Sequence, residues 1–154
     1  MTTDKPINGR PYITVAAVVE IDGRFLMVEE LEEGRTVYNQ PAGHVELNES
    51  LSAAVSREVL EETCLRFVPE SIIGFYLWSQ YLRVAFGGRI DSRPVSGCRL
   101  DECIVAVHCL DDKQIKHRAE QGLLRSPLVL PCFEDYRRGQ RYPLSMVRRV
   151  VGDP

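Results

Sequence analysis

Three closely spaced glutamates carry the clearest chemical signal in the sequence. Glu58, Glu61 and Glu62 fall within five residues of a segment whose pattern predicts a helix. Positions three and four apart share one helix face, so Glu61 and Glu62 both lie one turn from Glu58. The three negative charges therefore repel one another. The apolar residues Ala54 and Val55 continue this face, which directs Glu58 towards a surface where an unpaired carboxylate is costly. A hard divalent cation relieves both problems, because Mg²⁺ selects carboxylate oxygens.

A helix from about Ser50 to about Thr63 must position these carboxylates. Asn48 or Ser50 can cap its start, and we expect early acids to complement the positive end of the helix dipole. Before it, Pro41-Ala42-Gly43 breaks an extended segment and opens a loop.

Strands are expected on both sides of this helix. Apolar and β-branched runs predict extended segments over 12–20, 24–29, 35–40, 72–82, 84–90 and 103–109. Asp22-Gly23 predicts a hairpin turn, Gly87-Gly88 a bend or bulge, and the acid-rich segment 29–33 a solvated loop.

Two further helices complete the pattern. One is predicted over 111–120, and the other begins at Ser126-Pro127 and is kinked or split at Pro131. The alternation predicts an α/β fold in which helices flank a mixed β-sheet.

Length and composition predict one soluble domain over residues 1–154, with residues 1–10 as a flexible tail. Hydrophobic residues make up 44% and charged residues 27%, both ordinary for a globular protein. The net charge of −3 gives no indication of a nucleic-acid or membrane partner. The apolar runs are too short to span a bilayer and no signal pattern begins the chain, so we expect a cytoplasmic protein.

The five cysteines show no C-x-x-C spacing, and their odd number argues against a complete disulfide set. Cys103 and Cys109 lie in a β-branched run, where we expect small buried hydrophobic side chains. A structural metal site or a nucleophilic cysteine is disfavoured, because no ligand cluster or paired histidine accompanies them.

The segment 43–65 resembles the signature of the Nudix hydrolases. That signature begins with a Gly, five residues of any type, a Glu and seven more residues of any type. The motif Arg-Glu-apolar-any-Glu-Glu follows, and then come any residue, a Gly and an apolar residue. The fixed positions are matched by Gly43, Glu49, Arg57, Glu58, Val59, Glu61, Glu62 and Leu65. The last Gly is replaced by Cys64. Segments 38–44, 124–129 and 139–144 are also similar to the NudJ group of phosphatases in that family.

The resemblance implies an α/β/α sandwich that hydrolyses diphosphate linkages with Mg²⁺ or Mn²⁺ bound by the signature helix. It implies that Glu58 and Glu62 are the principal metal ligands and that Glu61 binds a second metal or positions water. Arg57 would orient Glu58, and Gly43 would let the backbone approach the metal. The general base is left open between these glutamates and an acid from a distant loop.

Other candidates have weaker support. Glu102 is an additional acidic ligand candidate, although exposed acids at strand ends are common. Arg125 and Arg141 lie in NudJ-like segments and could grip phosphate, or belong to solvated surfaces. His44 could contact phosphate or pack the loop.

Trp78 and Tyr81 could stack a base, although aromatic residues in strands more often belong to the core. Cys64 stands where a positive φ is expected, which costs a residue with a side chain about 1 kcal/mol. We therefore expect that turn to be strained or rerouted.

The NudJ-like segments imply release of terminal phosphate from nucleoside tri- and diphosphates and from hydroxymethylpyrimidine pyrophosphate. An ADP-ribose or other nucleotide-sugar pyrophosphatase is the rival enzyme. A non-catalytic nucleotide-binding module is the alternative from another class. The expected partner is a small nucleotide or pyrophosphate, in a monomer or a homodimer.

Overall fold

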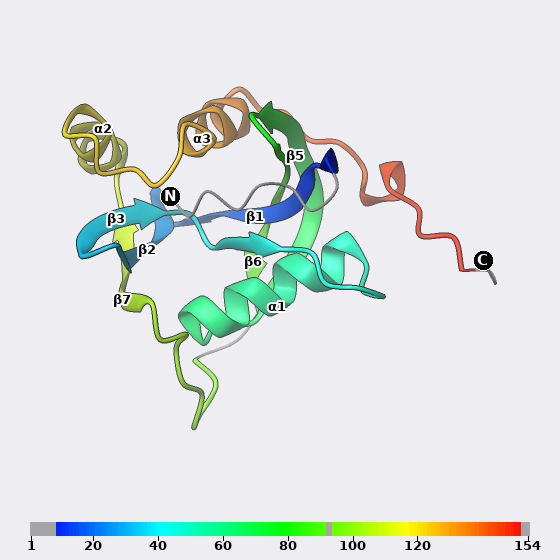
Figure 1. Ribbon diagram of the computed structural model, residues 1–154, viewed down its shortest axis with the longest axis horizontal. Coiled ribbons are helices and arrows are strands. Elements are labelled where there is room, and N and C mark those ends of the chain that lie inside the picture. The colour runs from blue at the N-terminus through cyan, green and yellow to red at the C-terminus, as the bar shows by residue number, and fades with distance from the viewer. Residues whose placement is uncertain (1–8, 92–93, 152–154) are drawn as a thin grey trace.

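The computed structural model describes residues 9–91 and 94–151. Most of the predicted tail over 1–10 lies outside this range. The elements in chain order are β1 (Tyr12–Ile21), β2 (Arg24–Glu32), β3 (Arg35–Asn39), β4 (Ala42–His44), α1 (Leu51–Thr63), β5 (Phe67–Trp78), β6 (Tyr81–Ile90), β7 (Ile104–Leu110), α2 (Asp112–Glu120), α3 (Val129–Arg137) and a short 3₁₀ helix (Leu144–Met146) (Figure 1).

The strands form one mixed sheet, as predicted. Its order is β3-β2-β1-β6-β5, with β4 paired to β1 and β7 paired to β2. β1 and β6 are parallel, and the other pairs are antiparallel. The Asp22-Gly23 hairpin is confirmed, because both residues adopt positive φ between β1 and β2.

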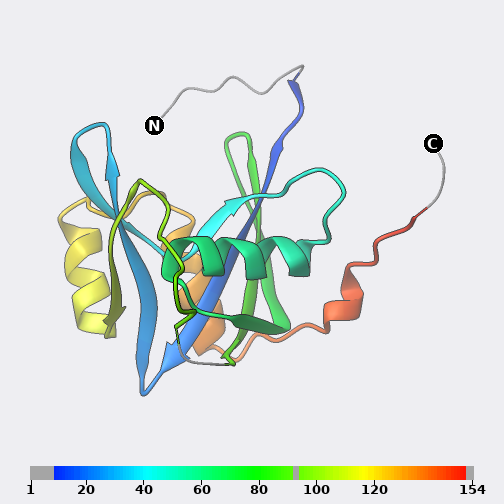
Figure 2. The same cartoon turned by 90° about the horizontal axis from the view of Figure 1, so that it is seen from below.

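Helices cover both faces of this sheet. α1 lies across one face, while α2 and α3 lie on the other (Figures 1 and 2). Side chains alternate along a strand, so β1 contributes to both layers. Val15 packs with Val55 on the α1 side, and Val18 packs with Phe133 on the α3 side. The α/β/α sandwich is therefore confirmed.

The start of α1 follows the prediction only in part. Ser50 is the N-cap, and its hydroxyl accepts a hydrogen bond from the backbone N–H of Ala53 at 3.1 Å. The expectation of early acids is wrong, because the first turn carries none. Glu49, the nearest acid, lies before the cap and binds Arg57 and the backbone N–H of Glu46.

The break between β5 and β6 differs from the prediction. It falls at Ser79-Gln80, where Ser79 adopts φ 52°, so Arg83 lies within a strand. The expected irregularity at Gly87-Gly88 is instead a register shift in β5, whose residues Pro69 and Ser71 face these glycines. Gly88 is needed there, because a side chain would press against the backbone of Val68.

The predicted acidic loop over 29–33 is mostly strand. β2 continues to Glu32 because Glu30 and Leu31 pair with β3 and the turn comes later, at Glu33-Gly34, where both residues have positive φ. Strand alternation then buries Glu30, which is 2% exposed.

The helix predicted from Ser126 begins later and is not broken by Pro131. α3 starts at Val129, and the Ser126 hydroxyl accepts a hydrogen bond from the Leu128 N–H at 3.3 Å. Pro131 is the third helical residue, where the missing N–H would have no intrahelical partner.

One disulfide joins Cys64 to Cys98, a pairing that the sequence did not reveal. Cys64 keeps the predicted positive φ, at 57°, and its cysteine partner comes from the loop after β6. The expectation that Cys103 and Cys109 are buried is wrong, because both are exposed. Cys103 lies just before the edge strand β7, and Cys109 lies within it. Within the described ranges, no helix is long and apolar enough to cross a membrane.

Candidate active site

The end of β4 is interlocked with the glutamates of α1. Glu62 accepts a hydrogen bond from the backbone N–H of Ala42 at 3.0 Å. The Glu58 carboxylate fills the space in which Gly43 would carry a side chain, since a Cβ there would lie closer to it than the 3.0 Å that real contacts respect. The signature glycine is therefore required by the close approach of the β4 backbone to a carboxylate.

Arg57 connects the carboxylates to the loop that precedes α1. Its guanidinium donates to both oxygens of Glu49, at 2.7 and 3.1 Å. It also donates to Glu58 at 2.7 Å, to Glu61 at 3.0 Å and to the backbone carbonyl of His44 at 2.9 Å. Arg57 thus contacts both Glu58 and Glu61, and its role in orienting Glu58 for a metal stays a prediction.

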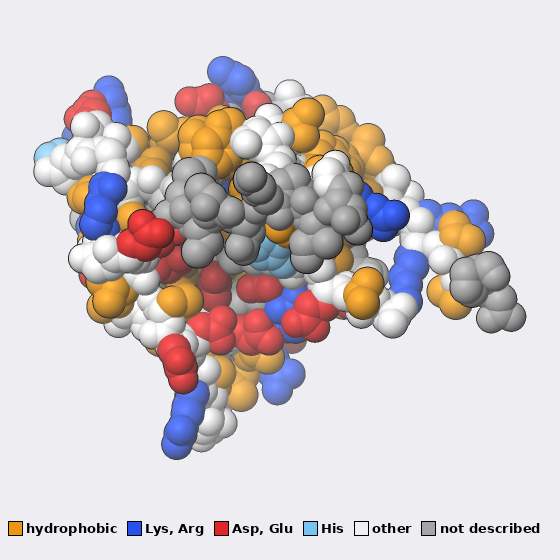
Figure 3. Space-filling model, viewed as in Figure 1, with side chains coloured by type: hydrophobic (Ala, Val, Ile, Leu, Met, Phe, Trp, Pro, Cys, Tyr) orange, Lys and Arg blue, Asp and Glu red, His pale blue; other side chains and the backbone are white. Residues whose placement is uncertain are grey.

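Burial makes the carboxylates of Glu58 and Glu62 reluctant to ionise. It raises the pKa of Glu62 to about 9, and the nearby charge of Glu30 adds to this effect. Burial also raises the pKa of Glu58, although Arg57 opposes the change. Figure 3 shows Asp and Glu side chains gathered over α1 around a Lys or Arg side chain. The single positive charge of Arg57 does not balance several ionised carboxylates. Keeping all of them ionised therefore requires a further positive charge.

A divalent cation fits this donor set. The buried carboxylates of Glu58 and Glu62 lie against the backbone of Gly43 and of Ala42, respectively. The Oε1 atom of Glu30 has no hydrogen-bond partner within the described residues. In residues 9–91 and 94–151, no three acidic, histidine or cysteine side chains already form a ready-made ligand group. Arg57 instead contacts Glu58 and Glu61, so a cation would compete with it for their oxygens.

Glu30 is the site residue that the sequence reasoning missed. It forms an ion pair with Arg125, which also lies 3.6 Å from Glu32. Burial raises the pKa of Glu30, while Arg125 and a hydrogen bond from Asn39 oppose that rise. The Glu33-Gly34 turn signal could have revealed the longer strand and hence the buried position of Glu30.

One predicted metal ligand and one predicted phosphate-binding residue lie away from this cluster. Glu102 is exposed in the turn before β7, whereas its neighbour Asp101 donates its backbone N–H to the Glu61 carbonyl at 3.0 Å. Arg141 lies over the ring of Tyr136, 3.9 Å from its centroid. The ligand roles of Glu102 and Arg141 stay predictions that this arrangement does not favour.

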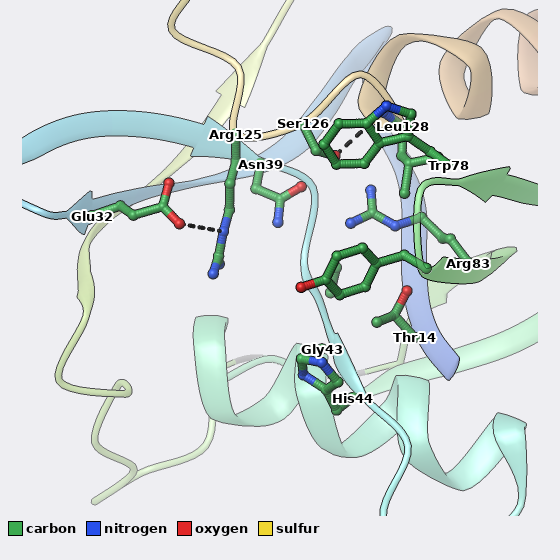
Figure 4. A pocket seen from close by; sticks show the side chains of 12 residues that line it. Thr14, Glu32, Asn39, Gly43, His44, Trp78, Arg83, Arg125, Ser126 and Leu128 are labelled. Atoms are coloured by element: carbon green, nitrogen blue, oxygen red, sulfur yellow. Dashed lines mark hydrogen bonds and ion pairs between the residues drawn. The ribbon is translucent and has the colours of Figure 1, made fainter. Parts of the chain in front are cut away.

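A cleft of about 140 Å³ lies beside the glutamates (Figure 4). Gly43, His44 and Arg125 contribute to its wall. Trp78 and Tyr81 also line it, with nearly parallel rings whose centroids are 6.5 Å apart. The strand pattern had favoured a place in the core for both residues. Both side chains are instead half-buried and lie at the cleft.

Comparisons with known proteins agree with this geometry. The sequence model of the NUDIX domain matches residues 10–126. The chain is 35% identical over 143 residues to the phosphatase NudJ of Escherichia coli K12, which covers 90% of this chain and 91% of that protein. Among solved structures, a NUDIX hydrolase from Nitrosomonas europaea is 43% identical with a TM-score of 0.86, covering 92% of this chain and 98% of the other.

A MutT protein from Methanosarcina mazei Go1 is 24% identical with a TM-score of 0.60, over 84% of this chain and 96% of the other, and shows the fold alone. The family match spans most of the chain and includes the interlocked segment of β4 and α1. The chain belongs to the Nudix family of hydrolases.

Proposed function

We propose that this protein is a divalent-metal-dependent phosphatase that releases terminal phosphate from nucleoside di- and triphosphates, and from hydroxymethylpyrimidine pyrophosphate. The observation that carries the proposal is the contact of Gly43 with the buried carboxylate of Glu58, next to Glu62. The 35% identity to the phosphatase NudJ supports the substrate class. The expected metal is Mg²⁺ or Mn²⁺, because the donors are carboxylate oxygens.

Glu58 and Glu62 would hold the metal. When bound, it would neutralise phosphate oxygens and lower the pKa of a bound water. Glu61 is the most accessible of the three glutamates, with 41% of its side chain exposed, and could accept a proton from an attacking water. Arg57 keeps Glu58 and Glu61 in register with the loop before α1.

Arg125 would bind the phosphate of the substrate, and its place in the lining of the cleft supports this role. Its side chain is 40% exposed and its guanidinium contacts Glu30 and Glu32. A phosphate would therefore compete with two carboxylates for this cation. His44 lies on the same wall and faces the rings of Tyr12 and Tyr81, which favours a packing role.

Phosphate release from GDP with Mg²⁺ tests the proposal. Glu62→Gln should abolish turnover, because it removes a buried anionic ligand and keeps the side-chain shape. Glu120→Gln, a change at an exposed helix end, should retain wild-type turnover. Phosphate release by Glu62→Gln at the wild-type rate, or no release by the wild type, would refute the proposal.

A substrate panel separates the rival enzyme. ADP-ribose turnover to AMP, far above phosphate release from nucleotides, would replace the phosphatase assignment with a nucleotide-sugar pyrophosphatase. Binding of nucleotides without turnover of any of them would instead favour the non-catalytic module.

A further inference from the structure

The disulfide between Cys64 and Cys98 lies at the end of the helix that carries the glutamates. Cys64 is the C-cap of α1, two residues after Glu62. Cys98 belongs to the segment 94–103, which crosses the C-terminal end of α1 before the chain enters β7 (Figures 1 and 2). Both cysteines are half-buried, and the residues on either side of Cys98 are exposed. A small reductant in solution can therefore reach the disulfide.

The same segment holds the last turn of α1 through the backbone. Asp101 donates its N–H to the carbonyl of Glu61 at 3.0 Å, and Val95 donates its N–H to the carbonyl of Cys64 at 2.8 Å. The last carbonyls of a helix find no partner within the helix and need one from outside. Segment 94–103 supplies two such partners in the turn that contains Glu61 and Glu62.

Segment 94–103 also brings negative charge to the carboxylate cluster. Burial raises the pKa of Glu58, and the charges of Glu61 and Asp101 add to that rise. A further anion beside the glutamates strengthens the attraction for a divalent cation. The position of the segment should therefore affect metal affinity in two ways, because it fixes the last turn of α1 and keeps Asp101 near Glu58.

Other features indicate that this disulfide is regulatory and not only a structural cross-link. A chain of 154 residues buries enough apolar surface to fold without cross-links. Cys103 and Cys109 are free and exposed. Exposed thiols persist where thiols are kept reduced, and a disulfide in such surroundings is usually transient and serves redox sensing.

We propose that the Cys64–Cys98 disulfide is a redox switch: the oxidised protein binds its divalent ion tightly, and reduction by a dithiol weakens that binding. The inference rests on the proposed function, whose metal site it regulates. Cys64 stands at the position of the last signature glycine, so this chain can cross-link the end of its metal-binding helix where a glycine could not.

The switch operates by thiol–disulfide exchange. One thiolate of the dithiol attacks the Sγ atom of Cys98, and Cys64 leaves as a thiolate that takes up a proton. The second thiol of the reductant then displaces Cys98, so the protein gains two electrons and two protons and the reductant leaves as a cyclic disulfide. The backbone hydrogen bonds to Glu61 and Cys64 remain, but each contributes little net free energy, so the segment detaches more often.

Calorimetry of Mg²⁺ binding tests the switch without catalysis. The reduced sample is prepared with dithiothreitol, which is removed under nitrogen before the titration, and circular dichroism checks that both forms are folded. Reduction should weaken Mg²⁺ binding about 10-fold, as expected when the surroundings of metal ligands lose a supporting contact. Reoxidation with oxidised glutathione should restore the affinity. Equal Mg²⁺ affinities of the two folded forms would overturn the proposal.

Variants without the disulfide provide an independent test. Cys98→Ser should bind Mg²⁺ as weakly as the reduced wild type and should not respond to dithiothreitol. Cys64→Gly should do the same, and it suits the positive φ of that position, which keeps the test usable if Cys98→Ser does not fold. Cys109→Ser removes an exposed free thiol and is the matched control, which should keep the full response to reduction. Wild-type Mg²⁺ affinity in either folded disulfide-free variant would overturn the proposal.

Turnover separates the switch from the proposed function. Phosphate release from GDP should fall about 10-fold on reduction when Mg²⁺ is below its dissociation constant, and should recover at saturating Mg²⁺. A loss that saturating Mg²⁺ does not reverse would overturn the proposal. If the oxidised enzyme releases phosphate and reduction changes neither binding nor turnover, the switch fails and the proposed function survives. If neither form releases phosphate, the proposed function fails and the calorimetric comparison still decides the switch.

Discussion

Replacing Gly43 with alanine should lower turnover by about 100-fold while most of the fold survives. The new Cβ would enter the space of the Glu58 carboxylate, closer than the 3.0 Å that real Cβ contacts respect. The β4 backbone cannot retreat easily, because its three residues pair with β1. Glu58 must therefore move by about 1 Å or more, and a misplacement of that size lowers turnover by about 100-fold.

The accompanying loss of stability should be modest. Overpacking of this kind costs about 1–3 kcal/mol, and each kcal/mol lowers the Tm of a protein of this size by roughly 2–4 °C. Gly87→Ala is the matched control, since its Cβ would meet the Ile73 methyl at 2.8 Å, within a strand and away from the glutamates. It should lose similar stability and keep its activity.

The assay is kcat/KM for phosphate release from GDP with Mg²⁺, measured beside urea unfolding of the same samples. Adding Glu58→Asp to Gly43→Ala shortens the clashing side chain and should restore part of the stability without restoring activity. A Gly43→Ala enzyme with wild-type kcat/KM would refute the reasoning that the glycine exists to admit Glu58.

Three further predictions concern charge and covalent linkage. Arg57→Lys should weaken Mg²⁺ binding about 10- to 100-fold in calorimetry, because lysine cannot hold Glu58 through a planar fork; unchanged affinity would contradict this. Without divalent ions, the unfolding free energy should fall as pH rises from 4.5 towards about 9, because native Glu62 keeps a proton that the unfolded chain releases. Urea titrations at several pH values check this, and Glu62→Gln should flatten the dependence of the unfolding free energy on pH. Cys98→Ser should lower the unfolding free energy by about 4 kcal/mol, because it opens a loop of 34 residues that the disulfide closes in the unfolded chain. A variant that is as stable as the wild type in urea titrations without reductant would argue against this chain-entropy account.

The sequence predicts those parts of the site that depend on neighbours along the chain. Gly43, Arg57 and the glutamates of α1 stand at fixed spacings, and a helix converts such spacings into proximity. The positive φ of Cys64 was also predictable, because the end of a helix favours that conformation whichever residue occupies it.

Features that depend on distant segments were not predictable in this way. Glu30 lies in an acidic run that suits a loop, and only its pairing with β3 and contact with Arg125 bury it. Cys98 reaches Cys64 because the loop after β6 returns to the end of α1. Arg83 looks like a charge that ends a strand, until the β5–β6 turn is placed at Ser79-Gln80.

Glu30 is the residue through which the carboxylate cluster and the cleft affect each other. Burial raises the pKa of Glu62 and the charge of Glu30 adds to that rise, while Arg125 and Asn39 stabilise the Glu30 anion. A phosphate that drew Arg125 away would leave Glu30 less compensated and make Glu62 still harder to ionise. A cation at Glu62 has the opposite effect, because it supplies the positive charge that Arg125 would otherwise provide. Metal and phosphate should therefore bind with positive coupling, each lowering the electrostatic cost of the other.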